Sequence, residues 1–203
     1  MEVIIDNLID KALQRAVPYK EYRAELDALV EVAKSGNLEH EDDYLEYRLL
    51  NQQRMKRLDK NFKLSESVLA QLKEVERPVV WIVLAESWCG DAAQSLPVLN
   101  KMAEASPNIS LKIALRDQNL ELMDQFLTDG GRSIPKLIMI DELTREVQDT
   151  WGPRPSIATA MVKEQKEKYG EITVEFRTEL QKWYTKDKGL TIVSDILKIL
   201  PLE

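Results

Sequence analysis

The sequence is poor in the residue types on which most catalytic and metal chemistry depends. Its 203 residues include one cysteine, Cys89, and one histidine, His40. A single cysteine excludes an internal disulfide and a multi-cysteine metal site, which fits a reducing compartment. A single histidine leaves no Cys–His nucleophile pair unless His40 folds back onto Cys89, and the sequence gives no sign of that.

Long apolar runs are also missing. The longest uncharged apolar run, residues 78–85, is far too short to cross a bilayer. Residues 1–6 show no positively charged leader followed by an apolar segment and a small-residue cleavage site. We therefore expect a cytoplasmic protein that has no membrane partner.

Positive charge is in the minority. The chain has 35 acidic residues against 28 lysines and arginines, which gives a formal net charge of −7, and no basic cluster stands out. This balance disfavours phosphate backbones as partners, so we expect no nucleic acid partner. The apolar fraction of 44% is sufficient for a sizeable core.

The densest acidic cluster surrounds the only histidine, in Glu39-His40-Glu41-Asp42-Asp43. Histidine and carboxylates are metal ligands, but negative charge is also favourable at the start of a helix. We favour the helix-start interpretation of this cluster. The sequence therefore predicts no metal site and no cofactor.

The only cysteine lies where a buried strand passes into a helix. Residues 79–85 form a continuous apolar run rich in β-branched residues, which is typical of a strand buried on both faces. From Asp91 onward, apolar residues recur at helical spacing to about residue 105. The first N–H groups of a helix lack internal partners, so a thiolate at Cys89 would be stabilised and the pKa of the thiol would fall.

Two separated motifs resemble the thioredoxin family. Residues 88–92, Trp-Cys-Gly-Asp-Ala, resemble the family's Trp-Cys-Gly-Pro-Cys site, and Pro97 follows the cysteine by eight residues as in thioredoxin. Residues 133–135, Ser-Ile-Pro, precede an apolar run at 137–140 and resemble the family's cis-proline loop. The resemblance covers about residues 65–152.

The resemblance implies a fold and a set of site residues. The fold is α/β, a thioredoxin-like three-layer core with a mixed sheet and helices on both faces, extended by helical additions at both ends. It implies Cys89 as the nucleophile and a cis peptide bond before Pro135, whose preceding residue would pair with an extended substrate. The substrate-binding residues implied in this way are Trp88, Gly90, Asp91, Ile134 and Pro135.

Hydrophobic periodicity supports the same organisation. We expect an N-terminal helical extension at 1–64 with no strand, a core at 65–152, and C-terminal helices at 153–203 packed on the core. Within the core, strands are expected at 79–85, 108–115, 136–141 and 145–150, and helices at 65–77, 91–105 and 119–127. The family's usual opening strand is missing, so we expect the helical extension to cover that sheet edge.

Three departures from the family pattern bear on reactivity. Ala92 occupies the position of the second cysteine, so no dithiol cycle can run within this chain. Val83 occupies the position of the family's buried acid, six residues before the cysteine. Asp91 replaces the proline, and its negative charge opposes the helix-end effect, so we expect only a modestly activated thiol.

Three functions fit these features. The first is a monothiol thiol–disulfide oxidoreductase that acts on a protein disulfide or peptide and needs an external thiol reductant. The second is a non-enzymatic thioredoxin-fold module that binds a protein. The third is a glutaredoxin-like iron–sulfur carrier, for which only Lys136 and Arg132 could contribute to a thiol pocket.

Overall fold

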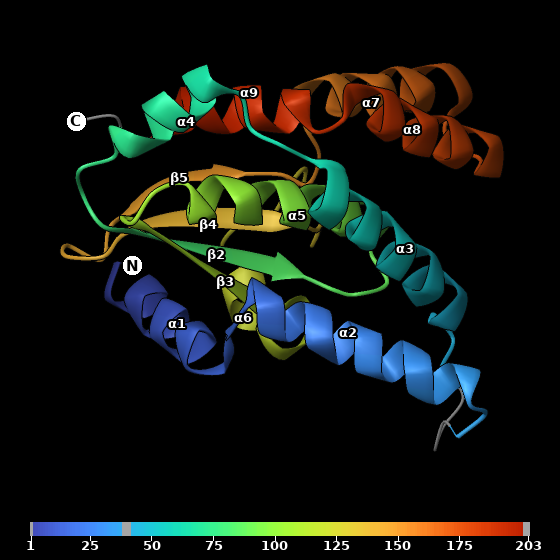
Figure 1. Ribbon diagram of the computed structural model, residues 1–203, viewed down its shortest axis with the longest axis horizontal. Coiled ribbons are helices and arrows are strands. Elements are labelled where there is room, and N and C mark those ends of the chain that lie inside the picture. The colour runs from blue at the N-terminus through green and yellow to red at the C-terminus, as the bar shows by residue number, and fades with distance from the viewer. Residues whose placement is uncertain (1, 38–41, 201–203) are drawn as a thin grey trace.

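The computed structural model describes residues 2–37 and 42–200. Its centre is a mixed five-stranded sheet with the order β1-β3-β2-β4-β5, covered by helices on both faces (Figure 1). This arrangement confirms the α/β fold class with helical additions at both ends. Residues 39–41 of the acidic cluster around His40 lie outside the described residues.

The strand register explains how two distant loops meet. β2 (Val79–Ala85) is fully buried and pairs in parallel with β3 (Ile109–Leu115). On its other side β2 pairs in antiparallel with β4 (Lys136–Asp141), with Leu84 opposite Lys136. The loop that follows β2 therefore lies beside the loop that precedes β4. β5 (Val147–Trp151) completes the sheet by pairing with β4.

The N-terminal segment contains a strand that the sequence did not predict. β1 (Val17–Pro18) pairs in antiparallel with β3, with Val17 opposite Ile113. Two residues are too few to produce the alternation by which strands are recognised, and proline is tolerated because the strand is at the edge. The expectation that residues 1–64 contain no strand was therefore wrong.

The helices of this segment lie on both sides of that strand in the sequence. α1 (Glu2–Arg15) and α2 (Tyr19–Lys34) contact β3 and, with α6 (Leu120–Met123), lie on one face of the sheet (Figure 1). A 3₁₀ turn (Arg116–Gln118) precedes α6. α6 is shorter than the expected helix at 119–127, because the chain leaves the helix at Asp124 and continues through turns to a left-handed residue at Asp129.

The opposite face is covered by α5 (Gly90–Glu104), which packs against α3 (Leu45–Asn61) and α9 (Leu190–Ile199). α4 (Glu66–Lys73) is capped by Ser65, since the N–H of Val68 donates to the Ser65 hydroxyl at 3.3 Å. None of the helices in the described part of the chain is long and apolar enough to span a membrane.

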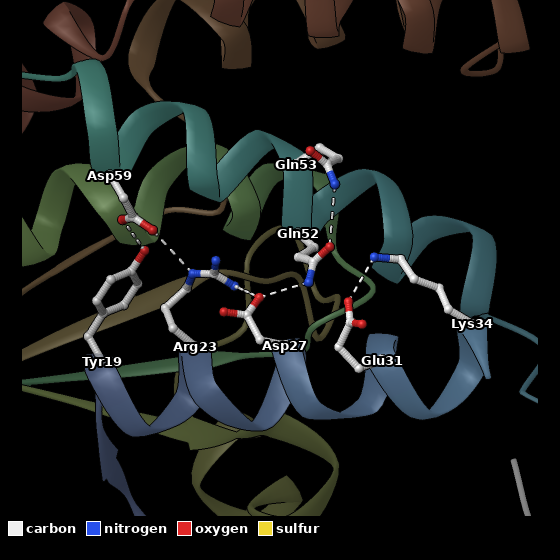
Figure 2. A network of polar contacts seen from close by, with 8 residues as sticks. All are labelled: Tyr19, Arg23, Asp27, Glu31, Lys34, Gln52, Gln53 and Asp59. Atoms are coloured by element: carbon white, nitrogen blue, oxygen red, sulfur yellow. Dashed lines mark hydrogen bonds and ion pairs between the residues drawn. The ribbon is translucent and has the colours of Figure 1, made fainter. Parts of the chain in front are cut away.

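A polar network fixes α3 against α2 (Figure 2). The hydroxyl of Tyr19 donates to Asp59 Oδ1 at 2.7 Å, and Arg23 Nε donates to Asp59 Oδ2 at 3.2 Å. Farther along, Gln52 Nε2 donates to Asp27 Oδ1 at 2.9 Å. Because these groups are partly buried, their hydrogen bonds specify how α3 is placed relative to the sheet.

α7 (Ser156–Tyr169) and α8 (Val174–Asp187) form a hairpin with a hydrophobic cluster of its own. Gly170 ends α7 in a left-handed conformation, with φ of 78°. The hairpin extends beyond the end of the sheet where β2 leads into α5 (Figure 1). The buried members of its cluster are Ala158, Val162, Phe176, Leu180 and Tyr184.

Candidate functional site

The two motifs that the sequence separates by 45 residues touch each other. The thiol of Cys89 donates to the carbonyl oxygen of Ile134 at 3.3 Å. The Ile134–Pro135 peptide bond is cis. This contact follows from the register of β2 and β4, which places the carboxyl end of one beside the beginning of the other.

Cys89 is the N-cap residue of α5. The N–H of Ala92, in the first turn, donates to the sulfur at 3.5 Å. The residue is nevertheless 8% exposed. Burial, reinforced by the charge of Asp91, raises the pKa of the thiol to about 12, and the N–H groups at the helix start and Arg154 offset this only in part. The expectation of a modestly activated thiol was therefore wrong, because desolvation outweighs the helix-end effect.

Asp91 is turned into the protein. Arg154 Nε lies 2.7 Å from its Oδ2, and the hydroxyl of Tyr184 donates to its Oδ1 at 3.0 Å. Burial raises the pKa of Asp91, and the charges of Arg154 and Arg54 together with the Tyr184 hydrogen bond oppose that rise. Asp91 therefore joins the first turn of α5 to the α7–α8 hairpin.

Trp88 is held by two neighbours. Its ring stacks on Tyr44 with centroids 5.0 Å apart and an interplanar angle of 24°. The guanidinium of Arg116 lies 5.2 Å from the centre of the indole ring, within range of a cation–π interaction. Trp88 is consequently a fixed, half-buried part of the site.

The loop between β2 and α5 is held by α3, a role that the sequence did not indicate. Arg48 Nε donates to the hydroxyl of Ser87 at 2.9 Å, and Asn51 Nδ2 donates to the Ser87 carbonyl at 2.9 Å. Arg48 also forms an ion pair with Asp42. Sequence reasoning missed these residues because α3 is distant in the chain. The one available signal was polar residues at the buried positions of a helix.

A buried acid is present near Cys89, although Val83 replaces the family's usual one. Glu86 precedes the cysteine by three residues and accepts a hydrogen bond from the N–H of Asp117 at 3.0 Å. Burial raises the pKa of Glu86. The hydroxyl of Tyr22 has its pKa raised by burial and then by the nearby Cys89 and Glu86.

A groove between α3 and α8 leads to the cysteine. It has a volume of about 750 Å³, and residues 88–91 line it at the end nearest the sheet. Ile134 and Pro135 are buried and are not among the lining residues. The segment Ile134–Pro135, where the resemblance implies that an extended substrate pairs, is therefore buried, and the groove is an approach that reaches Cys89.

The predicted thiol-pocket residues lie apart from this groove. Arg132 pairs with Asp124 on the surface, with Nε 2.6 Å from Oδ1. Lys136 is buried in β4, which lowers the pKa of its ammonium group. Within residues 2–37 and 42–200, no group of three histidine, cysteine or acidic side chains is arranged to hold a metal ion.

Comparisons with known proteins agree with this architecture. A family model described as thioredoxin matches residues 37–169. A crystal structure of a protein of unknown function from Pseudomonas aeruginosa aligns with a TM-score of 0.58 at 21% identity, over 74% of this chain and 83% of that one. An HIV epitope scaffold aligns with a TM-score of 0.54 at 20% identity, over 90% of this chain and 97% of that one. No curated protein is significantly similar to the chain.

Proposed function

The chain belongs to the thioredoxin family, and from this premise we propose that it carries out thiol–disulfide exchange of the monothiol type at Cys89. One observation carries the proposal. The cysteine sulfur lies between an N–H of the first turn of α5 and the carbonyl of Ile134, at the end of a groove large enough for a peptide. A sulfur in this position can attack a disulfide presented from the groove.

The reaction has two balanced steps. The thiol of Cys89 loses its proton, and its sulfur attacks one sulfur of a partner's disulfide to form a mixed disulfide. The partner's other sulfur leaves as a thiolate and takes up the proton. Because Ala92 cannot resolve the intermediate, an external thiol attacks the partner's sulfur, restores Cys89 and remains disulfide-bonded to the partner.

Four neighbouring residues are expected to position the partner or the thiol. Trp88 supplies a flat wall, and the backbone of Gly90 and Asp91 forms the adjoining edge of the groove. The carbonyl oxygen of Ile134 accepts the hydrogen bond of the Cys89 thiol before the exchange begins. Because Ile134 and Pro135 are buried outside the groove, pairing of an extended partner with this segment would also require the loop before β4 to open.

A second candidate, a module that binds a protein without redox chemistry, is favoured by the raised pKa of Cys89. With a pKa of about 12, almost all of the thiol is protonated at neutral pH. In that case the cysteine serves to cap α5 and to hold the loop at Ile134. The groove would then be the functional surface.

Covalent capture separates the two functions. The full chain is incubated with 5,5′-dithiobis(2-nitrobenzoate) and, separately, with an oxidised cell extract, and adducts are identified by mass spectrometry. Exchange predicts a stable adduct on Cys89 that glutathione releases, and no adduct on the matched Cys89→Ser variant. If the native chain remains unmodified at neutral pH while the unfolded chain reacts, the exchange proposal fails and the binding function replaces it.

A further inference from the structure

The groove between α3 and α8 continues along both helices as a positively charged seam. Next to the 750 Å³ groove lies a cavity of about 270 Å³, and beyond it one of about 430 Å³. Neighbouring cavities share lining residues, such as Arg54 and Gln181 for the first two and Arg57 for the last two. We call this continuous surface the α3–α8 seam.

The charge of the seam is opposite to that of the protein. The chain has a net charge of −7, yet of the acidic side chains in the described residues only Asp91 lines the seam, and Arg154 already neutralises it. The cationic side chains that line the seam are Arg54, Arg57, Lys63, Arg154, Arg177 and Lys188. An anionic ligand is therefore attracted to this surface although the rest of the protein repels it.

Two of these cations are half-buried without a carboxylate partner. Arg54 Nη1 donates to the neutral Asn51 Oδ1 at 2.8 Å. Arg57 donates to Thr185 Oγ1 at 3.1 Å and to Gln94 Oε1 at 3.2 Å. Within residues 2–37 and 42–200, neither guanidinium forms an ion pair.

Such an arrangement is unfavourable without a ligand. Charges removed from water are normally paired, and the two guanidinium groups repel each other. Burial and the charge of Arg57 both lower the pKa of Arg54, against the attraction of Asp91. An anion placed between Arg54 and Arg57 would relieve both the repulsion and the missing pairing.

Apolar side chains flank the same surface. Tyr47 and Leu50 on α3 are 50% and 52% exposed, and Val174 at the start of α8 is 72% exposed. All three line the groove at its mouth. A ligand that covers them must carry apolar groups as well as negative charge.

We propose that the α3–α8 seam binds an extended acidic peptide segment of a partner protein, with carboxylates at Arg54 and Arg57 and apolar side chains against Tyr47 and Leu50. A polypeptide alternates both kinds of group along its length, which matches the seam better than a compact anion does. The proposal names the class of substrate for the thiol–disulfide exchange at Cys89. It rests on the proposed function for the covalent exchange, whereas the binding of the peptide to the seam does not depend on that function.

The anion site lies directly beside the cysteine. A Cβ atom on Gly90, the residue after Cys89, would lie 3.2 Å from Arg54 Nη1 and 3.2 Å from Gln181 Nε2. A carboxylate on Arg54 therefore comes next to the start of α5. The partner is expected to carry an acidic residue close in space to the cysteine that it presents.

Fluorescence anisotropy tests the proposal. The probe is a fluorescein-labelled peptide of glutamates interspersed with phenylalanine and leucine, without cysteine, and the comparison peptide has glutamine at every glutamate. The full chain is expected to bind the acidic peptide at least about tenfold more tightly, with an affinity that falls as salt is added. Equal affinity for both peptides, or no binding of either, overturns the proposal.

Variants locate the binding. Arg54→Gln and Arg57→Gln are each expected to weaken binding of the acidic peptide about tenfold, and Arg57→Lys less. The exposed Arg177→Gln cannot disturb the core and is expected to weaken binding severalfold. The matched control Lys166→Gln/Lys182→Gln removes two exposed charges outside the seam and is expected to change nothing. If the control weakens binding as much as the seam variants do, a general charge effect replaces the proposed site.

Two further arms separate this inference from its alternatives. Cys89→Ser is expected to bind the acidic peptide as the native chain does, so peptide binding without covalent capture would reject the exchange and leave the seam proposal standing. A single-stranded RNA of similar length and charge is expected to bind more weakly than the peptide. Tighter binding of the RNA would overturn the assignment to an acidic polypeptide.

Discussion

Replacing Asp91 by asparagine should make Cys89 more acidic and more reactive. Asp91 is the charge that most raises the pKa of the thiol after burial itself, whereas Arg154 lowers it. The asparagine side chain would keep the shape and could still accept the hydrogen bond from Tyr184. The substitution would remove the negative charge of Asp91. It would also leave the positive charge of Arg154 without a counter-charge, and both changes favour the thiolate.

The magnitude can be worked out for a fixed pH. At pH 8 the thiol is four units below its pKa of about 12, so about one molecule in ten thousand carries the thiolate. Removal of a close like charge lowers a pKa by about 1–2 units, which raises the thiolate fraction about tenfold to a hundredfold. The same substitution breaks a buried ion pair, so we expect it to cost about 3 kcal/mol of folding stability.

Alkylation by iodoacetamide measures the effect directly. Pseudo-first-order rates are followed by mass spectrometry from pH 7 to pH 11 for the native chain and Asp91→Asn, with Cys89→Ser as the blank. Asp124→Asn removes a surface acid paired with Arg132 and serves as the matched control. A parallel urea titration gives the unfolded fraction, so that alkylation through unfolding can be subtracted. An unchanged or slower folded-state rate in Asp91→Asn would refute the electrostatic account of the site.

Three further predictions concern stability. Gly152→Ala should cost about 3 kcal/mol or more of folding stability in thermal unfolding, because the φ of Gly152 is 111° and the new Cβ would lie 2.1 Å from the carbonyl oxygen of Pro135. The control Gly36→Ala, which has open space around it, should cost about 1 kcal/mol. Asp59→Ala should cost about 2–3 kcal/mol of folding stability in urea unfolding, since the hydroxyl of Tyr19 and Arg23 Nε would lose their hydrogen-bond acceptor. Equal stability of Asp59→Ala and the native chain would contradict the network of Figure 2. The pKa of Cys89 is raised from 9.0 to about 12 on folding, so the unfolded thiol ionises first and folding stability is lost as the pH rises above 9. Between pH 8 and pH 10 the native chain should therefore lose about 1.4 kcal/mol more folding stability than Cys89→Ala. Parallel stability profiles of the two chains over this pH range would reject the raised pKa.

The sequence predicted the central elements well where a single physical signal dominated. β2 and β4 begin and end at the predicted residues, because strands buried on both faces leave uninterrupted apolar runs. The nearness of Cys89 to the loop at Ile134 was implied by the motif resemblance alone.

What the sequence did not reveal depends on tertiary packing. β1 is too short to carry a pattern. The pairing of Asp91 with Arg154 and Tyr184 joins residues brought together only by the fold, so Asp91 was interpreted as a helix-start acid. Cys89 is buried where its thiol meets the loop before β4, and without that burial the helix-end effect predicted the wrong direction for the thiol pKa.

The hydroxyl of Tyr184 gives the α7–α8 hairpin a thermodynamic link to the cysteine. Tyr184 belongs to the hairpin's own hydrophobic cluster, and its hydroxyl donates to the carboxylate whose charge, after burial, most raises the pKa of Cys89. A ligand that changes the position of the hairpin therefore changes the readiness of the sulfur to react. By reciprocity, ionisation of Cys89 changes the affinity of that ligand by the same factor. Ligand binding at the α7–α8 hairpin and the protonation state of the Cys89 sulfur are therefore thermodynamically linked.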